Sequence, residues 1–233
     1  MNDPGRAGDP ADWREAECAA VRTRPAARSW DDETVGLAVD EADRDAENCL
    51  KALWEAHGRR PAEDYLKDFG LKVVSVGFSD PWPRPYFAIY DSGDMTIEVN
   101  LRLIRDVSRH LRATGRGEWV ADDKLRQVAV AHELYHHLVF AGMASDTSES
   151  GVPESSEVSK RPSLRQRWKN RAAASRQAAR QEIIEEIAAV RFSQLMNGVD
   201  FSPLAYTKAA MELDSLREAG QDVDQGGDED RTE

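Results

Sequence analysis

The segment Ala131-His132-Glu133-Leu134-Tyr135-His136 constrains the fold of this chain most, because it places an H-E-x-x-H pattern inside a helical run. Four residues make slightly more than one helical turn, so His132 and His136 lie one above the other on one helix face. Two imidazoles in that arrangement can bind one divalent metal ion, and Glu133 can reach a water held by that ion as a general base. The structural alternative is a chance motif, with two ordinary core histidines.

The residues around the motif predict one buried helix over 122–142, with Asp122 or Asp123 as its N-cap and Gly142 as its end. Apolar residues at i, i+3, i+4 and i+7 spacing cover most of the circumference of this helix. Buried imidazoles need partners, and a metal ion would supply them. His137 points about 100° away from His136 and is predicted to be a supporting or structural histidine.

The composition bounds the class of protein. A chain of 233 residues with 40% hydrophobic residues suits one domain with appendages, or two small domains. Its net charge of -12 argues against direct nucleic-acid binding. There is no apolar run of transmembrane length and no leader-like N-terminus, so we expect a cytoplasmic protein without a membrane partner. Cys18 and Cys49 lack C-x-x-C spacing and are expected to be reduced thiols.

The order of patterns along the chain predicts an α+β domain over residues 41–217. A strand over 71–78 and a hairpin over 86–100 predict a small, antiparallel-rich sheet packed on the H-E-x-x-H helix. Residues 1–40 are expected to be mostly disordered, with a short helix over 13–21 as the alternative for that part. The acidic tail 218–233 is expected to be disordered, and 144–170 is expected to be a solvated insertion. Removal of residues 1–35 and 221–233 should therefore leave a folded core.

A second long helix is predicted to follow the insertion and to end at Asn197-Gly198. The basic stretch over 160–180 is interpreted as a solvated helix face, with nucleic-acid binding as the alternative. Further along, Glu182, Glu185 and Glu186 stand among Ile, Ala and Val, where carboxylates are costly unless they are paired or bound to a cation. A third metal ligand is therefore to be sought here, and the residues alone leave Glu185 and Glu186 both open.

The stretch over residues 126–137 resembles the active-site helix of the ImmA/IrrE-type zinc metallopeptidases, a gluzincin-like zincin family. In that family a later helix reads E-x-x-A-N-x-F-A-x-x-L, and the present chain matches it at Glu186, Ala189 and Phe192. The resemblance thus selects Glu186 as the third ligand. Glu182 lies one turn earlier on the same helix face and is a candidate for a supporting carboxylate. The chain departs from the family pattern with Tyr135 in place of a Gly, Val190 in place of an Asn, and the long insertion.

The resemblance implies a zincin-like fold and a zinc-dependent endopeptidase. His132, His136 and Glu186 would hold Zn²⁺ and leave the fourth position to water. Glu133 would accept a proton from that water and pass it to the leaving amine. The resemblance also implies a protein substrate that regulates transcription, such as a helix-turn-helix repressor, and no such module is evident in this chain.

Three further expectations concern the surroundings of the metal. Tyr135 and His137 are candidates to stabilise the oxyanion, and an extended substrate is expected to pair with an exposed strand over 95–100. His110 is expected to be exposed. Two other functions remain open from the sequence: a catalytically inactive metal-binding regulatory or interaction module, and a structural protein with a chance motif.

Overall fold

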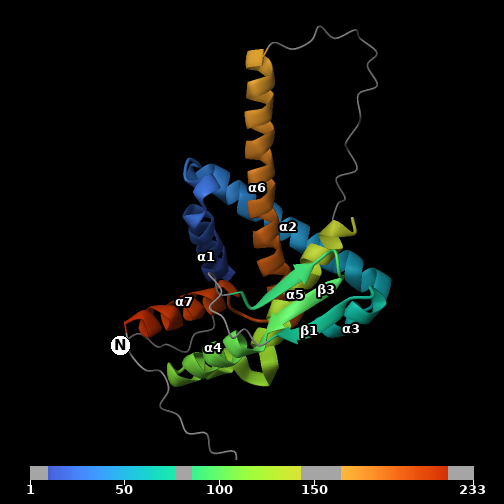
Figure 1. Ribbon diagram of the computed structural model, residues 1–233, viewed down its shortest axis with the longest axis vertical. Coiled ribbons are helices and arrows are strands. Elements are labelled where there is room, and N and C mark those ends of the chain that lie inside the picture. The colour runs from blue at the N-terminus through green and yellow to red at the C-terminus, as the bar shows by residue number, and fades with distance from the viewer. Residues whose placement is uncertain (1–9, 77–85, 143–163, 220–233) are drawn as a thin grey trace, which may run out of the picture.

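The computed structural model describes residues 10–76, 86–142 and 164–219, which form a mostly helical α+β protein (Figure 1). The expected α+β class is therefore confirmed. The elements are, in order, α1 (Pro10–Thr23), η1 (Pro25–Ala27), α2 (Asp32–His57), α3 (Ala62–Asp68), β1 (Lys72–Val76), β2 (Ala88–Asp91), β3 (Thr96–Asn100), α4 (Leu101–Ala113), η2 (Gly117–Asp123), α5 (Lys124–Phe140), α6 (Leu164–Asn197) and α7 (Leu204–Glu218).

The three strands of the described residues form one mixed sheet in the order β1-β3-β2. Strands β2 and β3 make the expected antiparallel hairpin, whose turn is closed by Asp91 Oδ1 accepting from the Gly93 N–H at 2.8 Å. Strand β1 pairs parallel with β3, so the expectation of an antiparallel-rich sheet is wrong. The strand expected to bind substrate, 95–100, is also not an edge, because β3 is hydrogen-bonded on both sides.

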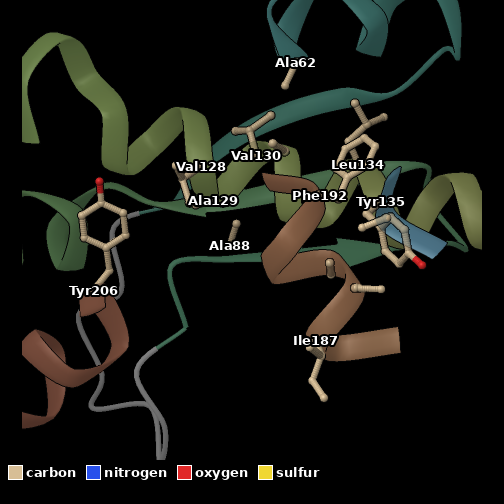
Figure 2. Packing of buried hydrophobic residues seen from close by; sticks show 14 of the residues in the cluster. Ala62, Ala88, Val128, Ala129, Val130, Leu134, Tyr135, Ile187, Phe192 and Tyr206 are labelled. Atoms are coloured by element: carbon tan, nitrogen blue, oxygen red, sulfur yellow. The ribbon is translucent and has the colours of Figure 1, made fainter. Parts of the chain in front are cut away.

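Helix α5, which carries the H-E-x-x-H motif, occupies the centre of the fold. It packs against α6, α3, β2 and β3. Val130, Leu134 and Leu138 are fully buried, as the apolar pattern predicted. Figure 2 shows Leu134 and Tyr135 of α5 beside Phe192 of α6, at the interface between the two helices. Burial on several sides fixes the direction in which the polar side chains of α5 point.

The N-terminal part of the chain departs from expectation. Residues 1–40 were predicted to be mostly disordered, with at most a short helix over 13–21, but residues 10–40 form α1, η1 and the first turns of α2. Small apolar side chains along these helices are buried, among them Val21, Ala27, Val35 and Val39. Ala and Val bury enough surface here to order helices whose outer faces are charged. This packing argues against the expectation that residues 1–35 can be removed without loss of the core.

Ion pairs join the charged faces of these helices to the rest of the fold. On α2, Glu41 and Asp43 accept hydrogen bonds from Arg180 and Arg191 of α6, each at 2.6 Å. The guanidinium of Arg191 also lies 4.2 Å from the ring centre of Trp13 of α1. The acidic face of α2 thus has basic partners on α6.

Helix α6 begins at Leu164, so the last part of the insertion expected over 144–170 is helical. The N-terminal end of this helix projects beyond the other helices (Figure 1). The remainder of the insertion, the first nine residues and the tail from residue 220 lie outside the described residues. None of the helices within the described ranges is long and apolar enough to cross a lipid bilayer.

Candidate metal centre

The two histidines of the motif meet a glutamate from α6. His132 Nε2 and His136 Nε2 lie 3.2 Å apart, and Glu186 Oε1 lies 3.4 Å from His136 Nε2. One ligand atom from each of the three residues falls within 4.8 Å of the other two, so this group could hold a metal ion. The spacing of the motif sets the first pair, and the packing of α6 along α5 brings the third residue to it.

The separations within this group fit a tetrahedral metal site. Bonds of about 2.0–2.1 Å from Zn²⁺ to nitrogen and oxygen place neighbouring tetrahedral ligands about 3.3 Å apart. The donor set, two imidazole nitrogens and one carboxylate oxygen, is also one that Zn²⁺ takes in catalytic sites. With the proton of His136 on Nδ1, the Nε2 lone pair and the Glu186 oxygen would repel each other at 3.4 Å, and a cation between them removes that repulsion. The residues therefore fit a divalent ion.

Glu185, the alternative candidate for the third ligand, contacts the other ring nitrogen of His136. Its Oε1 lies 3.1 Å from His136 Nδ1, on the far side of the ring from Glu186. An ionised carboxylate only accepts hydrogen bonds, so Nδ1–H of His136 donates to it. That bond fixes the tautomer that leaves the lone pair on Nε2, facing His132 and Glu186. Adjacent glutamates on α6 thus hold opposite sides of one imidazole.

Burial keeps the other imidazole neutral. The pKa of His132 is lowered to about 3, chiefly by burial and further by His136 and Arg24. Neutral imidazole is the form that binds metal. Glu182, expected as a supporting carboxylate, is exposed on α6. The carboxylate that supports His136 is that of Glu185.

Glu133 stands beside the three-residue group without joining it. Its Oε2 accepts a hydrogen bond from the backbone N–H of Tyr90 on β2, at 2.9 Å. Burial raises the pKa of Glu133 to about 7, while His136 and the Tyr90 N–H oppose the rise. A carboxyl group with a pKa near 7 can both accept and return a proton at neutral pH.

A cavity of about 400 Å³ opens beside these residues and is lined by His132, Glu133 and Glu186. Its other walls are mostly apolar and come from the segment leading into β2, from α5, from α6 and from α7. They include Phe87, Leu125, Val128, Val190, Leu204 and Met211. Val190 stands where the resemblance would place an Asn, so this wall offers a substrate apolar surface instead of an amide.

The two candidates for the oxyanion partner do not reach this cavity. Tyr135 is buried with its ring 5.4 Å from that of Phe192. His137 is buried on another face of α5, where its Nδ1 lies 2.9 Å from the Tyr90 hydroxyl. Neither candidate therefore lies on the cavity wall, because both side chains are buried in the core. Tyr135, in place of the family's Gly, therefore does not narrow the cavity.

Two residues lie where the sequence reasoning did not place them, one at the cavity and one away from it. Arg24, from the turn between α1 and η1, lines the cavity with Nη2 lying 3.7 Å from Glu186 Oε2. Nothing in its local sequence marks it, because its role depends on how α1 docks. His110, expected to be exposed, is buried with Nε2 at 3.3 Å from Glu212 Oε2, and it lies on α4, apart from the group of His132, His136 and Glu186.

Comparison with protein-family models, with curated proteins and with solved structures finds no match to this chain. The resemblance to the ImmA/IrrE-type metallopeptidases therefore stays a prediction from the two helices. What the fold and the site define is a mostly helical α+β protein with a possible His-His-Glu metal-binding group.

Proposed function

We propose that this chain is a zinc-dependent endopeptidase related to the ImmA/IrrE-type zincins. The observation that carries the proposal is the convergence of His132 Nε2, His136 Nε2 and Glu186 Oε1, with Glu133 on the same cavity wall. A zinc ion bound there would lower the pKa of a water and polarise a peptide carbonyl. That reaction class needs a base beside the metal ligands, and Glu133 is placed to be one.

The residues of the site have two roles: some bind the ion, and Glu133 transfers a proton. His132, His136 and Glu186 hold the ion, and Glu185 keeps the lone pair of His136 directed at it. Glu133 takes a proton from the attacking water and delivers it to the leaving amine. The Tyr90 N–H fixes the Glu133 carboxylate on the cavity side of α5, so the base is oriented before the substrate arrives.

The β2 edge of the sheet formed by the described residues gives a place for an extended substrate. Strand β2 is an edge strand and lies against α5. Its Tyr90 N–H points away from β3 to Glu133, and Ala88, two residues earlier, directs its own backbone groups to the same side. A peptide that pairs with Ala88 would run past the metal group. This geometry suits a protein segment in extended form, and the resemblance adds a transcriptional repressor as the regulatory substrate.

The test separates metal binding from hydrolysis. Purified protein should contain about one zinc per chain, whereas His132→Ala and His136→Ala should contain almost none. Glu133→Gln should keep the zinc and lose cleavage of a mixed peptide library, read by mass spectrometry, by a factor of about 10²–10⁴. No zinc in the wild type would overturn the proposal. Zinc without any Glu133-dependent product would instead favour the inactive metal-binding module.

A further inference from the structure

Arg24 is the one permanently charged cation among the described residues that line the cavity. The backbone around it is held in a turn, because Arg24 N–H donates to Val21 O at 2.9 Å and Ala27 N–H donates to Arg24 O at 3.0 Å. The side chain itself is about half exposed, at 51%. The backbone of Arg24 is thus fixed, while its guanidinium can adjust its position within the cavity.

The contact between Arg24 and Glu186 is loose. At 3.7 Å from Glu186 Oε2 the guanidinium gives an ion pair without a close hydrogen bond. Glu186 Oε1, the oxygen nearer His136, is the atom that would ligate the ion. A divalent ion would attract Glu186 and repel a guanidinium, so Arg24 is left with donors for another anion close to the metal group.

Two of the hydroxyl groups on the cavity wall, those of Tyr206 and Ser193, are already used. The Tyr206 hydroxyl donates to the backbone carbonyl of Trp119, and the Ser193 hydroxyl donates to that of Val190 at 2.7 Å. Tyr135 and His137, as shown above, face the core. Peptide hydrolysis needs a donor aimed at the carbonyl oxygen, where negative charge develops. Arg24 is the residue whose position and charge meet that need.

We propose that Arg24 is a further catalytic residue, which donates hydrogen bonds to the carbonyl oxygen of the scissile peptide bond as it becomes an oxyanion. The inference rests on the proposed peptidase function.

The charges balance in two steps. In the first step the water oxygen bonds to the carbonyl carbon, the carbonyl electron pair moves to oxygen beside Arg24, and the water proton goes to Glu133. In the second step the carbonyl re-forms, the carbon–nitrogen bond breaks, and Glu133 gives its proton to the amine. Arg24 stays protonated throughout.

The competing role for Arg24 is to orient Glu186 as a ligand. The direction in which zinc affinity changes when Arg24 is replaced separates the two roles. A residue that positions a ligand makes zinc bind more weakly when it is removed. An anion-binding guanidinium next to the ion repels it, so its removal leaves zinc affinity unchanged or increased. Arg24→Met keeps the length of the side chain and removes the charge, and Arg24→Lys keeps the charge without the forked donors.

Arg28 provides the matched control, because it follows in the same turn, is exposed and does not line the cavity. Arg28→Met should behave as the wild type in every measurement. The zinc-loaded proteins are titrated with inorganic phosphate, a tetrahedral anion, by calorimetry. We expect Arg24→Met to bind phosphate at least about tenfold more weakly than Arg28→Met, with equal zinc content and an equal midpoint of thermal unfolding.

Kinetics on a cleaved peptide complete the test. Arg24→Met should lower kcat by a factor of about 10²–10³ with little change in KM. The kcat of Arg24→Lys should lie between those of Arg24→Met and the wild type. Unchanged kcat and phosphate affinity in Arg24→Met, while Glu133→Gln abolishes cleavage, would overturn the role of Arg24 and leave the peptidase standing. Weakened zinc binding in Arg24→Met would also overturn it, in favour of ligand positioning. A wild type that binds no zinc would overturn the peptidase and Arg24's role together.

Discussion

At the scale of single residues, three glutamates surround two histidines and each has its own position. Glu133 follows His132 on α5 and reaches the Tyr90 N–H, whereas Glu185 and Glu186 are neighbours on α6. Consecutive residues of a helix point about 100° apart, so only one of two adjacent glutamates can face a given atom. His136 lies between their directions and therefore receives one carboxylate at each ring nitrogen.

This arrangement predicts graded losses of zinc. Glu186→Ala removes a ligand and should abolish stoichiometric binding, because two imidazoles alone hold zinc weakly. Glu185→Ala leaves the ligands in place but releases the His136 tautomer, so we expect zinc affinity to fall by about 10–100-fold. Competition with a zinc-binding dye would measure both.

Glu182→Ala is the control for both substitutions, because Glu182 is exposed one turn earlier on the same helix. It should leave zinc affinity at the wild-type value. A greater loss in Glu185→Ala than in Glu186→Ala would exchange the roles of the two residues.

The part of the candidate site that could be predicted is the part that local spacing determines. His132 and His136 are four residues apart on one helix, so their alignment follows from helix geometry. Glu186 came from a pattern on α6, and the residues alone could not separate it from Glu185. Two contacts depend on how the helices pack and have no signal in the local sequence. They are the contact of Glu185 with His136 Nδ1 and the position of Arg24 beside Glu186.

Among the elements, α1 packs against α2 and adds buried side chains to the core. One of them is Val21 of α1, which is 1% exposed. The turn between α1 and η1 carries Arg24 to the cavity. Stability and the proposed site thus share one element, and Ala27 of η1 is buried with Val35 of α2 in the same core.

Deletion of residues 1–30 should therefore destabilise the protein. It removes the buried side chains of Val21 and Ala27 and uncovers Val35 and Val39 on α2, so we expect a loss of about 3–5 kcal/mol in the free energy of unfolding. Urea denaturation followed by circular dichroism would measure it. Deletion of residues 1–9, which contain no large apolar residue except Met1, is the control and should change the midpoint little. Equal midpoints for the two deletions would contradict the packing of α1.

Helices and hairpins were predictable where a short-range pattern determines them. The apolar stripe marked α5, and the turn residues after Asp91 marked the hairpin of β2 and β3. The parallel pairing of β1 with β3 joins segments distant in the chain, so the centre of the sheet was mistaken for an edge. For α1, the sequence suggested only a short helix over 13–21 in a mostly disordered segment, because charged residues dominate its composition. The structure instead packs this helix on α2, where Arg14 pairs with Asp40.

At the scale of the whole molecule, charge is distributed unevenly between surface and core. The net charge of -12 comes from 43 acidic and 31 basic residues, and many acids are paired at helix surfaces, where each pair contributes little. Glu17 is the exception, because this α1 carboxyl is only 2% exposed. Its Oε1 accepts from the Ser202 hydroxyl at 2.9 Å, and its Oε2 has no hydrogen-bond partner among the described residues.

Burial of Glu17 makes the stability of the entire fold depend on pH. Burial raises the pKa of its carboxyl from 4.5 to about 7, against smaller opposing effects of Ser202, Arg191 and Arg24. In the unfolded chain the same carboxyl has its ordinary pKa. Between about pH 4.5 and pH 7 the folded form holds a proton that the unfolded form has lost. Stability from this group is therefore complete below pH 4.5 and falls as the pH rises through that window.

The substitution Glu17→Gln isolates this effect, since glutamine keeps the shape and an oxygen for Ser202 but carries no charge at any pH. We expect the free energy of unfolding of Glu17→Gln, relative to the wild type, to rise by about 3 kcal/mol between pH 4.5 and pH 8, because a shift of one unit corresponds to about 1.4 kcal/mol. Urea denaturation of both proteins at several pH values gives that difference, and the other titrating groups cancel in it. A difference that does not change with pH would show that the Glu17 carboxyl is ionised in the fold as readily as in water.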